Sequence, residues 1–278
     1  MLNLLRMDLY RLARSKCVYI CLAILIAISI LCFGLIWMLA TPEGRNAAAQ
    51  IGMTATENGF TLSTSVSEPA EEGSILPNYN ILHMFREIAM DGGGYTCILG
   101  IVISIFVCHD YNSGFIKNIL SLHRQRWKYI LSKILAAGIL NLVYLGISFS
   151  CCLLLNGLFG GLVPLAPAAD ILLYISLSWL LTTAFAALFI LIITLSRSTS
   201  AGILSTLLLG SGIAVSVLVT CTRYWGFQNW INYTLYVNQT NAPSCYSSTV
   251  DLKGYAVGAV FLILYSAAAM GILKHKDV

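Results

Sequence analysis

Positions 94–108 read GYTCILGIVISIFVC, and this stretch decides how many times the chain crosses a membrane. It contains no Asp, Glu, Lys, Arg or His. At a helical rise of about 1.5 Å per residue it reaches only about 22 Å, whereas the hydrocarbon core of a bilayer is about 30 Å thick. It can cross only if it takes in its neighbours, so we predict a span over 90–109.

Five further uncharged, apolar runs lie around this stretch, at 17–40, 134–155, 171–195, 201–221 and 254–273. Charged residues make up 10% of the chain and hydrophobic residues 58%. Soluble domains carry about 25% charged residues, so this composition excludes an ordinary soluble enzyme. The positive charges lie beside apolar runs, which argues against a nucleic-acid-binding domain. We therefore predict an all-α integral membrane protein, a single domain over 1–278 with six transmembrane helices.

The distribution of charge orients these spans, because cytoplasmic loops carry an excess of Lys and Arg. With six spans, one side holds 12 Lys and Arg against 3 acids, and the other holds 4 against 9. Without the 90–109 span, the dense basic cluster from Lys117 to Lys133 would lie outside. We therefore keep the span and place both termini in the cytoplasm. The first run, at 24 residues, is too long for the apolar region of a signal peptide, which has about 7–15.

The segments between the spans include a predicted amphipathic helix over 1–16, along the inner leaflet, with Leu2, Leu5, Leu9 and Leu12 on one face. An unordered basic flank is the alternative. Outside, we expect a loop over 41–89 that ends in a short helix from Ile81 to Met90. A second outer loop, 222–253, is rich in aromatic residues that rest on the interface or form a substrate gate. Cys221 precedes this loop and Cys245 lies within it, and the two could form a disulfide, since they face the oxidising side.

The sequence lacks several catalytic motifs. No Gly is followed directly by Lys, so there is no P-loop, and HExxH is absent. We predict no enzyme activity, no metal and no cofactor in this chain. The uncharged spans argue against ion-coupled transport, which uses ionisable groups inside the membrane. Neutral polar residues such as Asn141, Thr182 and Thr183 are expected to join helices rather than bind a ligand.

The segment after the second span, HDYNSGFIKNILSL at 109–122, is the most informative. Asp110 and Ser113 can cap a short helix, and Gly114 permits a tight bend. An apolar ridge follows at helical spacing, formed by Phe115, Ile116, Ile119 and Leu120. An exposed ridge needs a partner, although it could instead sink into the inner leaflet. The cytoplasmic loop is predicted over 110–133, and its basic residues at the inner interface are Arg124, Arg126, Lys128 and Lys133.

Here the sequence resembles the permease subunits of ABC-2 type exporters, particularly those of bacitracin resistance and lantibiotic immunity. Asp110 matches the acidic position of that family, Gly114 its glycine, Phe115–Leu122 its coupling helix and Arg126–Lys133 the return to the third span. The resemblance implies that the residues coupling the permease to an ATPase are Asp110, Gly114, Phe115, Ile116, Lys117, Ile119 and Leu120.

The same resemblance implies a cytosolic ABC ATPase as partner, which would bind ATP and Mg²⁺, and a second permease chain, the same or different. It implies export of a hydrophobic or amphipathic compound, such as a peptide antibiotic, across the plasma membrane of a Gram-positive bacterium. Membrane lipids are the other expected partners. The alternatives are a membrane sensor or assembly protein that binds an external ligand, and a lipid-modifying membrane enzyme.

Overall fold

The computed structural model describes residues 2–40, 53–56, 59–62, 80–116, 127–159, 161, 163–225, 228–243 and 252–275. Its helices are α1 (Leu2–Arg14), α2 (Lys16–Ala40), α4 (Ile81–Phe85), α5 (Gly94–Asn112), α7 (Trp127–Leu158), α8 (Ala168–Ser196), α9 (Thr199–Gly210), α10 (Ile213–Trp225), α11 (Leu235–Thr240) and α12 (Leu252–His275). A π-helical turn (Arg86–Met90) and 3₁₀ turns (Asp91–Gly93, Gln228–Tyr233) connect some of them. Strands β1 (Met53–Thr56) and β2 (Gly59–Leu62) form an antiparallel hairpin.

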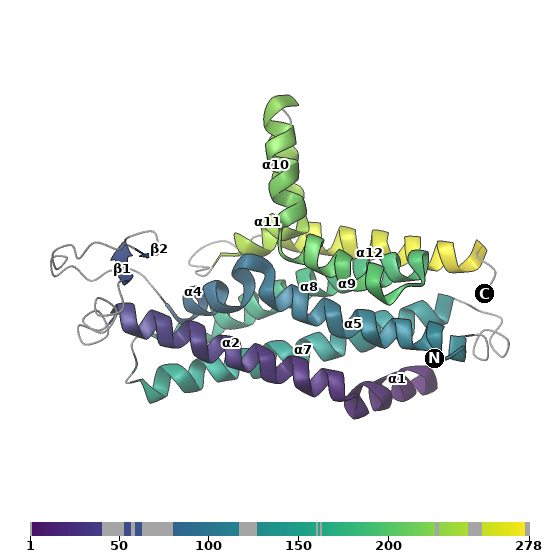
Figure 1. The fold of residues 1–278 in the computed structure, drawn as a ribbon, viewed down its shortest axis with the longest axis horizontal. Helices are drawn as coiled ribbons and strands as arrows, with labels where there is room; N and C mark the ends of the chain where they lie inside the picture. The colour runs from purple at the N-terminus through teal and green to yellow at the C-terminus, as the bar shows by residue number, and fades with distance from the viewer. Residues whose placement is uncertain are drawn as a thin grey trace.

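The long helices run along one direction and form a bundle (Figure 1). Five stretches of the described chain are long and apolar enough to cross a membrane, and the pair α9 and α10 makes a sixth if it counts as one span. This confirms the predicted all-α membrane architecture. The two termini lie at the same end of the bundle (Figure 1). We call it the inner end, because the charge distribution predicts that it faces the cytoplasm.

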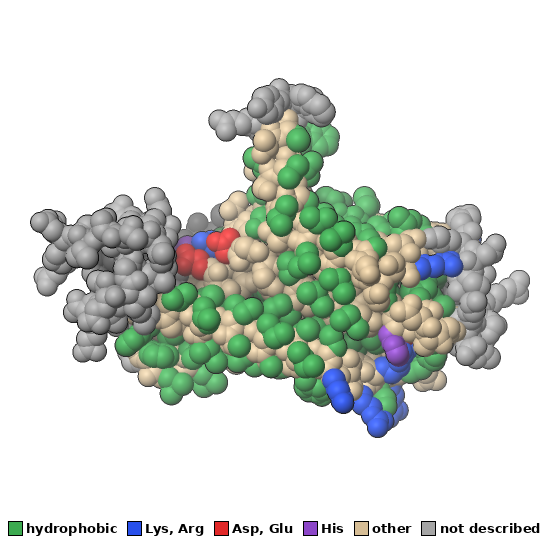
Figure 2. All heavy atoms as spheres, in the orientation of Figure 1, with side chains coloured by type: hydrophobic (Ala, Val, Ile, Leu, Met, Phe, Trp, Pro, Cys, Tyr) green, Lys and Arg blue, Asp and Glu red, His purple; other side chains and the backbone are tan. Residues whose placement is uncertain are grey.

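Apolar and charged side chains occupy different parts of the bundle surface, as expected for a membrane protein. In Figure 2, apolar side chains cover the flank, Lys and Arg gather at the inner end, and acidic side chains lie near α4 at the other end. The exposed acids there include Glu87 and Asp91. Large apolar side chains on the flank are half or more exposed, among them Leu142, Val143 and Ile263. Such exposure is favourable only where lipid replaces water.

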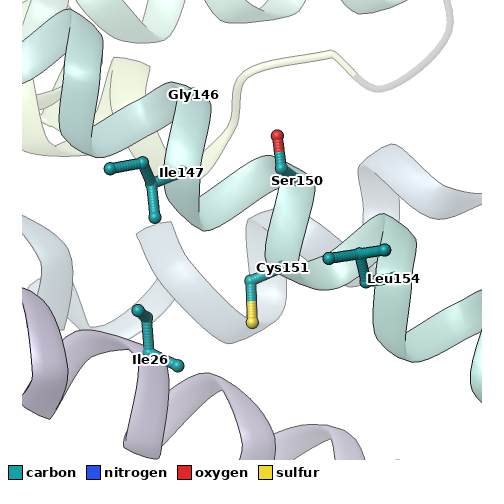
Figure 3. Close-up of a pocket in the computed structure, with 6 residues that line it drawn as sticks. All are labelled: Ile26, Gly146, Ile147, Ser150, Cys151 and Leu154. Atoms are coloured by element: carbon teal, nitrogen blue, oxygen red, sulfur yellow. The ribbon is translucent and has the colours of Figure 1, made fainter.

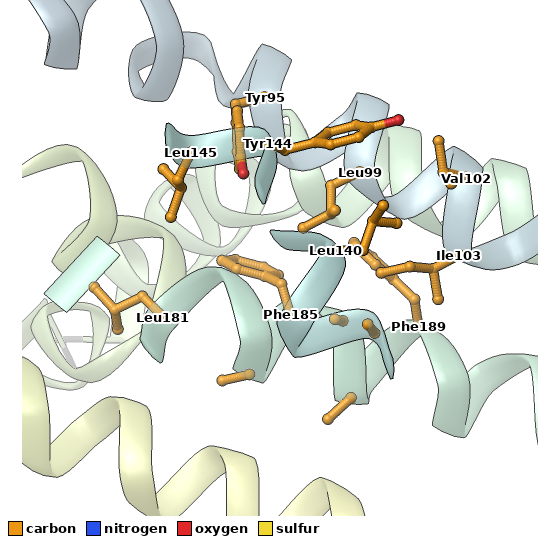
Figure 4. Close-up of a cluster of buried hydrophobic side chains, with 14 of the residues drawn as sticks. Tyr95, Leu99, Val102, Ile103, Leu140, Tyr144, Leu145, Leu181, Phe185 and Phe189 are labelled. Carbon is orange, nitrogen blue, oxygen red and sulfur yellow. The ribbon is translucent and has the colours of Figure 1, made fainter. Parts of the chain in front are cut away.

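α8 lies at the centre of the bundle and packs against α5, α7, α9 and α12. Of the five long spans it is the most buried. Figure 4 shows Phe185 and Phe189 of α8 among Leu99 and Ile103 of α5 and Leu140 of α7. All five side chains are nearly or fully enclosed. A helix that is apolar on all sides takes this central position because every face meets another helix.

Asn141 joins three helices inside this core. Its side-chain amide donates to the hydroxyls of Thr182 (2.7 Å) and Thr183 (3.0 Å) on α8. Its Oδ1 accepts from the hydroxyl of Tyr95 on α5 at 2.8 Å. Asn141, Tyr95 and both threonines are buried. The prediction that these neutral polar groups link helices is confirmed, since the site leaves no side-chain group of Asn141 open to a ligand.

The fifth span differs from the single helix predicted over 201–221. α9 ends at Gly210, and α10 begins at Ile213 after a bend of 58°. α10 then projects away from the bundle (Figure 1). Gly212 explains the break, because its backbone is left-handed (φ +78°) and the ring of Tyr236 occupies the space that a Cβ would need. Glycine alone adopts this conformation without strain.

Two glycines before α5 have the same backbone conformation but different surroundings. Gly92 and Gly93 both have φ +69°. A Cβ on Gly92 would meet nothing within 4 Å, whereas one on Gly93 would overlap the carbonyl oxygen of Gly210. The chain entering α5 is therefore held directly against the end of α9.

We predict that Gly93→Ala destabilises the protein more than Gly92→Ala does. Both changes carry the left-handed strain of about 1–2 kcal/mol. Only Gly93→Ala adds an overlap with the backbone, which costs about 1–3 kcal/mol more. Thermal unfolding of the purified protein in detergent measures the difference. Equal melting temperatures for the two variants would show that the contact with α9 contributes nothing.

Candidate functional site: an ionic cluster beside the predicted coupling segment

Asp110 lies in the last turn of α5, and its side chain is fully buried. Three donors from two other helices meet its carboxylate. Arg11 Nη2 of α1 lies 2.6 Å from Oδ1, and Lys133 Nζ of α7 lies 2.6 Å from Oδ2. The hydroxyl of Tyr129, also on α7, donates to Oδ2 at 2.9 Å. The carboxylate thus fastens α1 and α7 to the end of α5.

Lys133 connects Asp110 to a second buried carboxylate. Its Nζ donates to Asp8 Oδ1 at 2.7 Å, and the hydroxyl of Ser132 donates to Asp8 Oδ2 at 2.7 Å. Nζ also lies 3.9 Å from the ring centroid of Phe106. The ionic cluster, which we define as Asp8, Arg11, Asp110 and Lys133, therefore contains two acids and two bases, so its formal charge is zero. Asp8, Asp110 and Lys133 are buried and Arg11 is partly exposed; this burial is tolerable because each charge has an opposite partner.

Helical spacing brings the cluster together. Asp8 and Arg11 are three residues apart on α1, while Phe106 with Asp110 on α5, and Tyr129 with Lys133 on α7, are four apart. Residues at these spacings share one face of a helix. Each helix therefore presents two members of the site on the face that it turns to the others.

The buried face of α1 overlaps the predicted one at Leu12 but is rotated from it elsewhere. Its buried side chains are Leu4, Asp8 and Leu12, spaced by four, and it lies against α7. The expected apolar face held Leu5 and Leu9, which are only half buried. Asp8 lies four residues from both Leu4 and Leu12, but the sequence predicted no role for it. It is buried because it pairs with Lys133 at 2.7 Å.

The predicted loop over 110–133 is shorter in the structure. α7 begins at Trp127, so Lys128 and Lys133 are helical. Lys128 is half buried, and its Nζ lies 5.9 Å from the ring centroid of Trp127. Lys133 was predicted to lie at the inner interface. This prediction is wrong, because only 1% of the residue is exposed. It is held inside by two carboxylates.

The coupling segment, which we define as residues 110–122, is described as far as Ile116. The backbone of Gly114 is left-handed (φ +67°), and the chain turns there. This confirms the predicted bend. Asp110 does not cap a following helix, because its carboxylate binds α1 and α7. The Phe115 ring packs against the guanidinium of Arg11, with 4.5 Å between Cζ of Arg11 and the ring centroid. Ile116 is buried within this chain and is not part of an exposed ridge.

The remaining predicted site residues lie outside the described part of the chain. They are Lys117, Ile119, Leu120, Arg124 and Arg126, and Cys245 at the outer end. Cys221 is exposed on α10. Its pairing with Cys245 stays a prediction.

Within the described residues, no group of three or more His, Cys, Asp or Glu side chains could hold a metal ion. Each acid of the cluster is paired with a cation at 2.6 or 2.7 Å. The cluster joins three helices, next to the turn at Gly114. These features define a multi-pass membrane protein in which buried ion pairs join α1, α5 and α7 at one end of the bundle.

The chain belongs to the ABC-2 transporter family, since residues 84–243, more than half of its length, match the family model described as "ABC-2 family transporter protein". It is a membrane permease of an ABC transporter, the transport component and not itself the ATPase, and the family implies association with an ABC ATPase. No curated protein matches the sequence significantly. The matched region contains Asp110 and Lys133, whereas Asp8 and Arg11 precede it. The ionic cluster thus joins the family region to the N-terminal helix.

We predict that Lys133→Met destabilises the protein by about 3–5 kcal/mol, because it leaves Asp8 without its cation in a buried site. Adding Asp8→Asn should recover part of this loss, since it removes the stranded charge. Thermal unfolding in detergent measures both effects. Lys128→Met is the matched control and should change stability by no more than about 0.5 kcal/mol. If Lys133→Met unfolds at the same temperature as this control, the cluster does not stabilise the bundle.

Proposed function

We propose that this permease is the membrane subunit of an exporter whose separate cytosolic ATPase binds the coupling segment. The observation that supports this most is the position of Asp110. It stands at the start of the coupling segment and is bound to Arg11 and Lys133 at 2.6 Å each. A force applied to the segment would therefore act on α1, α5 and α7 together.

Phe115 offers a second path for the same force. Its ring packs under Arg11, and Arg11 in turn pairs with Asp110. In this proposal the partner ATPase binds ATP and Mg²⁺, and its closure displaces the coupling segment. The three fastened helices then move as one body against α8 and α12. A second permease chain, the same or different, would complete the transport path.

The proposed substrate is a hydrophobic or amphipathic compound. In the described spans, the buried polar side chains away from the ends are neutral, as at Ser104, Asn141 and Thr182. Such groups provide no titratable site for coupling transport to an ion gradient. The energy must then enter from the ATPase. The resemblance to bacitracin-resistance and lantibiotic-immunity exporters supports a peptide antibiotic as substrate, and the plasma membrane of a Gram-positive bacterium as the location.

We predict that Leu120→Asp uncouples the permease from its ATPase. Leu120 lies on the apolar ridge expected from the sequence, and a carboxylate there would oppose burial in a partner's groove. The permease, co-expressed with the ATPase subunit, is purified from membranes. The measurements are the amount of ATPase that co-purifies and transport of the antibiotic. Both should fall at least about tenfold, the effect of about 1.4 kcal/mol, with unchanged insertion in the membrane.

Ser198→Asp is the control, because it adds the same charge at the inner end in a different loop. Ser198 is exposed at the N-cap of α9, where Asp is also a favourable residue. It should leave binding and transport intact. Full co-purification with Leu120→Asp would exclude the coupling segment as the docking site. If no ATPase accompanies the wild-type permease, the alternative of a sensor or assembly protein is favoured.

A further inference from the structure

Two hollows lie on the flank of the bundle, and they differ in chemistry. The first, between α2 and α7, has a volume of about 350 Å³ and is lined by Ile26, Gly146, Ile147, Ser150, Cys151 and Leu154. Figure 3 shows that Ile26 of α2 faces Cys151 of α7, while the hydroxyl of Ser150 points away from Ile26. No charged side chain lines this first hollow, so it offers no group that would distinguish one apolar ligand from another.

The second hollow lies between α1 and α5 at the inner end and has a volume of about 330 Å³. α1 contributes Tyr10, Arg11 and Arg14, and Ser15 adds a hydroxyl where α1 meets α2. From α5 come the imidazole of His109 and, one turn further from the inner end, the apolar side chains of Ile105 and Phe106. One hollow therefore combines a polar, basic part with an apolar wall.

The charges around this hollow favour an anion. Asp8 and Asp110, the acids of α1 and α5, are both buried in the ionic cluster. No acidic side chain lines the hollow. Arg14 is exposed and donates to the hydroxyl of Tyr10 at 3.3 Å. Among the described residues, Arg14 forms no ion pair. Its charge is therefore available to a ligand.

Arg11 has unused donor capacity as well. Its Nη2 is paired with Asp110, whereas its buried Nη1 has no hydrogen-bond partner in the described part of the chain. A buried donor without a partner is costly. A phosphate oxygen in the hollow could accept a hydrogen bond from the guanidinium of Arg11 after a small shift of that group, since a guanidinium binds phosphate through two parallel hydrogen bonds.

The position of the hollow indicates the source of the anion. Tyr10 and Tyr19 are exposed, by 65% and 59%, near the junction of α1 and α2, as expected for aromatic residues at a membrane interface. Figure 2 shows Lys, Arg and His side chains gathered at this end of α1 and α5. The cytoplasmic leaflet carries anionic lipids, whose headgroups lie at this depth.

We infer that this hollow binds the headgroup phosphate of an anionic phospholipid from the inner leaflet. Arg14, Tyr10 and His109 contact the phosphate, and Arg11 lies behind it. Ile105 and Phe106 receive the first part of an acyl chain. Free phosphate shares the headgroup chemistry, but it would leave the apolar wall without an occupant. The inference concerns lipid binding by this chain and is independent of the proposed exporter function.

The test is native mass spectrometry of the purified full chain in detergent, titrated with phosphatidylglycerol or with phosphatidylcholine. The wild type should retain phosphatidylglycerol in preference. Arg14→Gln should weaken this binding about fivefold, the usual effect of one cation at an anionic headgroup. Arg6→Gln makes the same change on an exposed residue of α1 outside the hollow, and should have little effect.

Ile105→Trp provides a second variant that alters no charge and fills the apolar part of the hollow. It should also weaken phosphatidylglycerol binding. Equal losses in Arg14→Gln and Arg6→Gln would overturn the inference, because they would indicate a general attraction to a basic helix. Complete displacement of the lipid by excess inorganic phosphate, or equal retention of phosphatidylcholine, would overturn it as well.

Discussion

The burial of Asp110 is the constraint on which the inner end of this permease depends. A carboxylate removed from water must be neutralised, and here the neutralising groups come from two other helices, through Arg11 and Lys133. Lys133 in turn requires Asp8, so the demand for neutrality extends across α1, α5 and α7. The amphipathic helix is therefore part of the bundle and does not merely rest on the membrane.

In the proposed function, this fastening connects the coupling segment to three helices. The segment leaves α5 through a left-handed glycine, Gly114, directly after the cluster. Phe115 and Ile116, the last described residues of the segment, pack back against the protein. Further into the membrane, Asn141 joins α5, α7 and α8 through neutral hydrogen bonds. Charged contacts thus hold the inner end together, and neutral ones the core.

Much of this organisation could be predicted from local patterns. Uncharged runs marked the spans. The coupling role of the segment around Asp110 and Gly114 was suggested by the family resemblance and stays a prediction. Lys133 was placed at the interface because a lysine beside an apolar run usually reaches water. Asp8 was overlooked because nothing within α1 shows that a cation from a distant helix will meet it. Burial of an ion pair is a property of two segments 125 residues apart in the sequence.

The sequence by itself determined the membrane class and the six apolar stretches and predicted their orientation, because hydrophobicity and charge act residue by residue against a fixed solvent. Only the tertiary structure decided that the fifth stretch breaks at Gly212, where the Tyr236 ring removes the room for a side chain. It also decided which face of α1 is buried and which charges neutralise one another. These outcomes depend on space and distance between segments, which no local pattern contains.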